Sequence, residues 1–127
     1  MIVKPYSTHM AVFGAVLALL RENRKIKQGA FAKKIEMSSP SVSKIEKGET
    51  PLSYDNLRKC SETLGIKTSK LLEICENVEE ALRDRGIRVL TKSPEEITAV
   101  TDSLEMILSS KMLKEYIRTS KVSELLE

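Results

Sequence analysis

The chain has 127 residues, of which 41% are hydrophobic, 31% are charged and only 4% are aromatic, with no tryptophan. This length allows one domain, or a small domain of about 65 to 75 residues with an extension, and it excludes a large multidomain enzyme. The composition is typical of a small helical protein with an aliphatic core, and it excludes the disordered and disulfide-rich classes.

The charge is distributed unevenly along the chain. Residues 1–75 carry 13 Lys and Arg against 7 Asp and Glu, net +6, whereas residues 76–127 carry 8 against 11, net −3, within a formal total of +3. A basic first part suits a polyanion such as nucleic acid, which would repel the mildly acidic second part. Charge alone leaves the alternative open that both parts are ordinary solvated surface.

Two helices are predicted within the first 35 residues. Apolar residues recur at helical spacing as far as Asn23, and Ser7 or Thr8 offers a hydroxyl cap at the start of this first helix. A second helix, only about two turns long, is predicted over residues 27–35. The apolar run in the first helix is shorter than the roughly 20 residues that span a bilayer, so no membrane anchor is expected.

The stretch "SSPSVSKIEKG" follows, and it predicts a third helix over about residues 39–47. Serine and proline clusters usually mark loops. Here, however, Ser38 or Ser39 can cap the first free amides, and Pro40 lies in the first turn, where a missing N–H costs nothing. Gly48 can adopt the left-handed conformation that ends a helix.

Two more helices complete a predicted five-helix domain. A fourth is expected between a Ser53 cap and Gly65, and a fifth from a Thr68 or Ser69 cap to about Arg85, since no helix breaker intervenes.

No catalytic or metal site is expected. Cys60 and Cys75 are too far apart for a zinc knuckle, and the single histidine is His9, so both cysteines are predicted to be core residues. The sequence has no Gly-rich phosphate loop and no histidine beside a nucleophile. We therefore predict that the protein is not an enzyme and that it binds no cofactor or metal.

The remaining chain is predicted to contain one short strand and one or two helices. Residues 87–91 alternate like a strand, and "SPEE" at residues 93–96 is a strong helix start, followed by an apolar stripe that continues to Ile117. A lone strand and an exposed stripe each need a partner. We predict a two-fold dimer of antiparallel strands and paired helices; the alternative is that this segment folds back on its own N-terminal domain. The predicted dimer residues are Ile87, Val89, Ile97, Val100, Leu104, Ile107 and Leu108.

The middle of the chain carries a longer pattern. Its residues are Gln28, Phe31, Ala32, Ile35, Val42, Ile45, Glu46 and Gly48. With a leucine-rich helix before it and "LRKCSETLGI" after it, this pattern resembles the lambda-repressor and Cro-like (XRE-type) helix-turn-helix family over about residues 10–75. The resemblance implies an all-α, five-helix DNA-binding domain over residues 1–75. The strand and helices predicted from the later pattern make residues 76–127 a C-terminal α/β-minor extension.

The resemblance also implies which residues meet DNA. Docking of the third helix in the major groove implies base contacts from Ser39, Pro40, Ser43 and Lys44. Phosphate contacts are implied for Lys27, Gln28, Ser38, Lys47, Thr50 and Ser53. Arg21 and Glu46 match a pair that joins the first helix to the end of the third in such proteins. Glu36 stands where the family usually has glycine, so either a positive φ or a different turn is expected there.

These expectations lead to a sequence-specific regulator of transcription, most simply a prokaryotic or phage repressor that occludes a promoter as a dimer. The alternative is an antitoxin or anti-effector, whose C-terminal half binds a partner protein while its helix-turn-helix domain autoregulates. The expected partners are double-stranded DNA and a second copy of the chain, with a separate protein partner in the alternative. The expected location is the cytoplasm.

Overall fold

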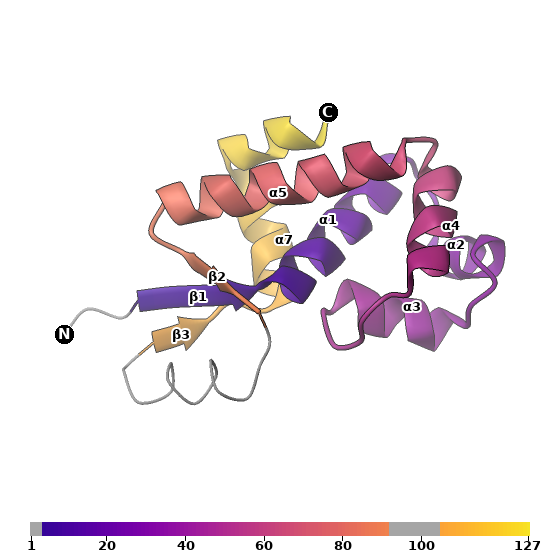
Figure 1. Ribbon diagram of the computed structural model, residues 1–127, viewed down its shortest axis with the longest axis horizontal. Helices are drawn as coiled ribbons and strands as arrows, with labels where there is room; N and C mark the ends of the chain where they lie inside the picture. The colour runs from indigo at the N-terminus through magenta and orange to yellow at the C-terminus, as the bar shows by residue number, and fades with distance from the viewer. Residues whose placement is uncertain (1–3, 92–104) are drawn as a thin grey trace.

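The fold is mostly helical with one small parallel sheet, and the computed structural model describes residues 4–91 and 105–127 (Figure 1). In chain order the elements are β1 (Lys4–Thr8), α1 (His9–Asn23), α2 (Gln28–Lys34), α3 (Ser39–Glu46), α4 (Tyr54–Leu64), α5 (Thr68–Asp84), β2 (Arg88–Leu90), β3 (Glu105–Ile107), α7 (Ser110–Thr119) and the 3-10 helix η1 (Lys121–Leu126). The sheet lies at one end of the molecule, and α2, α3 and α4 lie at the other. The predicted fold class, an all-α domain of five helices with a small α/β extension, is confirmed.

Helix α1 is the centre of the core. Thr8 caps its first turn by accepting a hydrogen bond from the Ala11 N–H at 3.1 Å, as predicted for one of the two hydroxyl residues there. Ten of its fifteen residues are buried. A helix that is apolar on nearly all sides has to be surrounded by protein, and α1 packs against β1, α3, α5 and α7.

Helices α3 and α4 begin and end as their sequences predict. The hydroxyls of Ser38 and Ser53 each accept a backbone N–H of the first turn at 3.2 Å. Gly65 ends α4 with left-handed backbone angles.

Helix α5 differs from its prediction at the start and agrees with it at the end. Its cap residue is Lys67, which provides no side-chain hydrogen bond, so the predicted hydroxyl cap at Thr68 or Ser69 is wrong. The helix then continues without a break to Asp84, close to the predicted end. The predicted domain boundary between residues 75 and 76 therefore falls inside a continuous helix.

Three short parallel strands form the sheet, in the order β2-β1-β3. Tyr6 of the central strand β1 pairs with Arg88 of β2 on one side and with Ile107 of β3 on the other. Of these strands, only β2 was predicted. It was expected to pair antiparallel with the same strand of a second copy, but it pairs parallel with β1 of its own chain. Ile87 and Val89, two of the predicted dimer residues, are consequently buried in the core of their own chain.

The predicted C-terminal helix is only partly correct. Ile107 lies in β3, and the N–H of Leu108 donates a hydrogen bond to the carbonyl oxygen of Tyr6 at 2.7 Å, so this part of the chain extends the sheet. Helix α7 begins only after a Ser109 cap. The other predicted dimer residues, Ile97, Val100 and Leu104, lie outside the described residues.

Residues 110–126 fold back onto the N-terminal part of the chain. Leu113 and Ile117 of α7 are fully buried, and α7 packs along α1. Val122 of η1 is buried as well, and η1 packs on both α5 and α7. This is the arrangement that the sequence left open as the alternative to a dimer.

Both cysteines are core residues, as predicted. Cys60 and Cys75 are free and buried, and burial raises the pKa of each thiol to about 12. Within the described ranges, no group of three or more His, Cys, Asp or Glu residues is placed to hold a metal ion. None of the helices in those ranges is long and apolar enough to cross a membrane.

Two glycines allow α3 to lie unusually close to α1. A Cβ atom at Gly14 would lie 2.5 Å from the carbonyl oxygens of both Ile45 and Glu46, at the end of α3. Gly48 has a φ of 74°, and a Cβ atom there would lie 2.7 Å from the Cα atom of Ala11. Backbone therefore approaches backbone at both positions, and any larger residue would force the two helices apart.

We predict that Gly14→Ala destabilises the protein by roughly 1–3 kcal/mol, because the added methyl group overpacks the crossing of α1 and α3. Gly29→Ala is the matched control, since a Cβ atom at Gly29 in α2 would meet nothing within 4 Å. That control should be neutral, or stabilising by up to about 1 kcal/mol. Urea unfolding followed by circular dichroism measures both effects; similar values for the two variants would contradict a close crossing at Gly14.

Candidate nucleic-acid interface

The turn between α2 and α3 contains an acidic residue in a strained conformation. Glu36 has a φ of 58°, which is the positive value that the sequence allowed for this position. Lys59 Nζ donates a hydrogen bond to Glu36 Oε2 at 2.8 Å, and this contact lowers the pKa of the Glu36 carboxyl. Lys59 therefore compensates the negative charge that Glu36 places beside α3.

Arg21 and Glu46 join α1 to the end of α3. Arg21 Nε donates to Glu46 Oε2 at 2.7 Å, and Arg21 Nη2 donates to Glu46 Oε1 at 3.0 Å, so the contact has two points. Each of the two residues is only 8% exposed. The hydrogen bond to Glu46 raises the pKa of Arg21, and burial opposes this effect without cancelling it. Arg21 therefore stays protonated in the interior.

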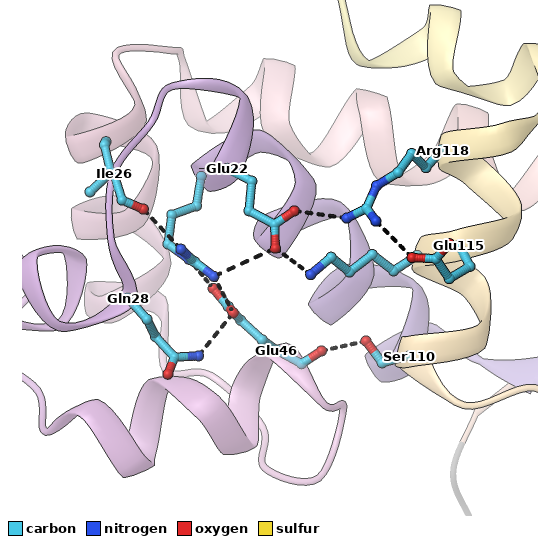
Figure 2. Close-up of polar contacts among 9 residues, drawn as sticks. Glu22, Ile26, Gln28, Glu46, Ser110, Glu115 and Arg118 are labelled. Atoms are coloured by element: carbon cyan, nitrogen blue, oxygen red, sulfur yellow. Dashed lines mark hydrogen bonds and ion pairs between the residues drawn. The ribbon is translucent and has the colours of Figure 1, made fainter.

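Two neighbours extend this contact (Figure 2). Arg21 Nη1 donates to the carbonyl oxygen of Ile26 at 2.8 Å, and Gln28 Nε2 donates to Glu46 Oε1 at 3.1 Å. A side-chain amide carries two hydrogens, so one remains for a ligand. Gln28, at the first position of α2, is thus held in place while its second amide hydrogen stays free to donate to a ligand.

The four predicted base-contacting residues do not share one environment. Ser39, Pro40 and Lys44 are exposed on α3, whereas Ser43 is half-buried and lines a cleft beside α7. Lys44 makes no ion pair with any residue that the structure describes. The accessible part of α3 thus presents one hydroxyl, one apolar ring and one unpaired ammonium group.

The predicted phosphate-contacting residues also differ from one another. Lys27 and Lys47 are exposed and, within residues 4–91 and 105–127, form no ion pair. The hydroxyls of Ser38 and Ser53 each accept a cap hydrogen bond, and Ser38 also shares one with the Ser41 hydroxyl. Accepting a hydrogen bond does not use the hydroxyl hydrogen that a phosphate contact needs. Thr50 is exposed and lines a separate, mostly apolar cleft. Lys27 and Lys47 supply the positive charge of the set, and Gln28 keeps one amide hydrogen.

A polar network that the sequence did not reveal ties α7 to this region (Figure 2). Glu22 of α1 forms ion pairs with Lys114 and, at 3.0 Å, with Arg118 of α7. Ser110 at the start of α7 donates a hydrogen bond to the carbonyl oxygen of Glu46. No local pattern signals these contacts, because the partners lie far apart in the chain. Helix α7 thus holds both helices that the buried ion pair joins.

The environment of Glu22 favours its charged form. Burial raises the pKa of Glu22, but the hydrogen bond and charge of Lys114, with the charges of Arg118 and Arg21, lower it by more. The net shift is downward from the ordinary value of 4.5. Glu22 is therefore ionised at neutral pH and attracts the cationic side chains of α7.

Comparison with known proteins points to the same region of the chain. Residues 17–71 match the helix-turn-helix family, of the XRE type, and this range contains the whole of α2, α3 and α4. A similar fold occurs in the crystal structure of the clp gene regulator ClgR from Corynebacterium glutamicum, with a TM-score of 0.56 and 19% identity. That similarity covers 74% of this chain and 90% of that chain. No curated protein sequence matches the chain.

We predict that the protein loses stability as the pH falls below about 4.5, partly through Glu22. A carboxyl with a lowered pKa stabilises the fold above its unfolded pKa, and this contribution disappears as the pH falls through the folded pKa. Because Glu22 is partly exposed, its contribution is about 1 kcal/mol or less. Glu22→Gln should be less stable at pH 7 and should show a flatter decline between about pH 5 and pH 3.

The measurement is the free energy of unfolding from urea titrations at several pH values. Glu80→Gln, which removes an exposed carboxylate from α5, controls for the loss of a surface charge. A Glu22→Gln variant whose stability declines as steeply as that of the unmodified chain would show that Glu22 does not hold α7.

Proposed function

Since residues 17–71 of this chain match the helix-turn-helix family, we propose that the protein is a sequence-specific transcription regulator that inserts α3 into the major groove of double-stranded DNA. The observation that carries the proposal is the placement of α3. Its inner side is fixed to α1 by the Arg21–Glu46 pair, while Ser39, Pro40 and Lys44 remain exposed. A rigidly held helix with an accessible polar end is what reading base edges requires.

The chemistry of these three side chains sets what they can read. Lys44 can donate hydrogen bonds to guanine, and Pro40 can make apolar contact with a thymine methyl group. Ser39 can donate or accept, so it discriminates weakly. We expect one well-specified guanine in each half-site, with weaker preferences beside it.

Residues around α3 supply the contacts that hold the helix in register. Lys27 and Lys47 are exposed cations without a counter-charge in the described part of the chain, and Gln28 keeps one free amide hydrogen. Such groups bind phosphate oxygens and orient a protein on the duplex without reading its sequence. They also make the affinity fall as the salt concentration rises.

We further propose that the protein acts as a dimer and represses by occluding a promoter. One good base contact provides roughly 1–3 kcal/mol of discrimination, whereas specific sites are usually preferred by about 4–10 kcal/mol. Two copies reading two half-sites would reduce this gap. Among the predicted dimer residues that the structure describes, Ile107 is the most accessible to a second copy, since it is 53% exposed on the edge strand β3. Leu108 beside it is half-buried.

The competing function, an antitoxin or anti-effector, has less support. A toxin-binding segment is predicted to lack structure until its partner protein binds. Leu113 and Ile117 are instead buried against the protein's own α1. We therefore propose a transcription regulator in preference to an antitoxin or anti-effector.

Selection of binding sites from a random DNA pool, with the full-length protein at about physiological salt, tests the proposal, because non-specific binding is weak under these conditions. We expect an inverted repeat with half-sites about one helical turn, or 34 Å, apart. A single half-site would support the reader and contradict the dimer. A pool that stays random would contradict sequence-specific binding by this protein alone.

The docking of α3 makes a second prediction about two neighbouring lysines. Lys44→Ala should reduce the preference for the selected site by roughly 1–3 kcal/mol if Lys44 reads guanine. Lys47→Ala should weaken binding to all sequences alike and should reduce the salt slope by about one unit. Fluorescence anisotropy with the selected and a scrambled duplex measures both. Equal effects of the two variants would mean that α3 docks in another register.

A further inference from the structure

A basic cleft lies where α7 meets the proposed DNA-binding surface. Its volume is about 290 Å³, and it opens between α1, α2, α3 and α7. Four cationic side chains line it: Arg21, Lys47, Lys111 and Lys114. Glu46 is the one carboxylate among the lining residues.

The charges in this cleft are only partly compensated. Arg21 is paired with Glu46, and Lys114 is paired with Glu22. Lys47 and Lys111 are exposed, and neither forms an ion pair with a residue that the structure describes. The cleft therefore has an excess of two positive charges, one on α3's end and one on α7.

The composition of the cleft connects it to the DNA surface. Gln28, Ser43 and Lys47 line it from α2 and the end of α3, and all three are residues for which DNA contacts were expected. Lys111 lines the same cleft from α7. A DNA backbone that follows Gln28 and Lys47 would therefore run past Lys111.

We propose that this cleft receives a backbone phosphate of DNA and that Lys111 binds it together with Gln28 and Lys47. The proposal rests on the proposed function, and it extends the DNA-binding surface beyond the helix-turn-helix region into the C-terminal segment. A free inorganic phosphate would meet the same groups, but a strand already held by Lys47 would be presented to Lys111 at a much higher effective concentration.

The position of Lys111 is fixed before any ligand binds. Ser110, the preceding residue, is hydrogen-bonded to the carbonyl oxygen of Glu46, and Leu113, two residues later, is fully buried. Only the Lys111 side chain then has to be ordered on binding, which limits the entropy cost.

The net charge of the C-terminal segment does not oppose this contact. Residues 76–127 carry a net charge of −3, which suggested repulsion from DNA. Helix α7 itself contains Lys111, Lys114 and Arg118 against one carboxylate, Glu115. Although the segment as a whole is acidic, the helix whose start meets the end of α3 is basic.

The test measures DNA affinity of the full-length chain and of Lys111→Ala over a range of salt concentrations, by fluorescence anisotropy. The probes are the selected duplex and a scrambled duplex of equal length. Loss of one phosphate contact should weaken binding roughly three- to tenfold near physiological salt and reduce the log–log salt slope by about 0.9. Both duplexes should be affected alike, because a phosphate contact reads no sequence.

Lys121→Ala is the matched control. It removes the same charge from the exposed start of η1, which lies on the side of the molecule away from α3 in Figure 1. This variant should retain the salt slope of the unmodified chain, and Lys111→Arg should restore most of the affinity. Circular dichroism melts of all variants verify that the fold is intact.

The outcomes separate this inference from the function on which it rests. If the unmodified chain binds neither duplex, the proposed function and the phosphate site both fail. If it binds and Lys111→Ala leaves the salt slope unchanged, the phosphate site alone is refuted. If Lys121→Ala lowers affinity as much as Lys111→Ala does, the effect belongs to net charge and the cleft has no special role.

Discussion

The ion pair between Arg21 and Glu46 fixes the orientation of α3, and the proposed DNA-binding surface depends on that orientation. Its two-point geometry at 2.7 and 3.0 Å leaves little rotational freedom between α1 and the end of α3. Removing one partner of a buried pair usually costs about 3–5 kcal/mol, because the remaining charge is left without compensation. The pair restricts α3 to one packing on α1. Gly14 allows the backbones of the two helices to approach closely enough for the pair to form.

The C-terminal segment reinforces the same crossing from the other side. Ser110 binds the backbone of Glu46, and Lys114 and Arg118 bind Glu22 on α1. Helix α7 thus supports α3 through Ser110 and also places the cation Lys111 near its end. The extension therefore supports the proposed DNA-binding surface, although it lies outside the matched helix-turn-helix region.

Local sequence signals were sufficient for most of the helical part. Thr8, Ser38 and Ser53 act as caps, and Gly65 ends α4, because each depends only on neighbouring backbone groups. The strands β1 and β3 were not predicted, because they do not depend on neighbouring residues alone. Each has only a few residues, and each is stabilised by pairing with chain segments far away in the sequence.

The sequence by itself determined the helices of residues 8–84 and the two core cysteines, since these follow from periodicity, capping chemistry and the lack of metal-ligand spacing. The pairing of Arg21 with Glu46 was expected from the family resemblance. Only the tertiary structure decided that β2 pairs with β1, that Ile87 and Val89 face their own core, and that α7 brings Lys111 to the end of α3. The physical reason is that hydrophobic burial is non-directional. An apolar stripe shows that something must cover it, but the choice between the same chain and a second copy depends on the whole folded shape.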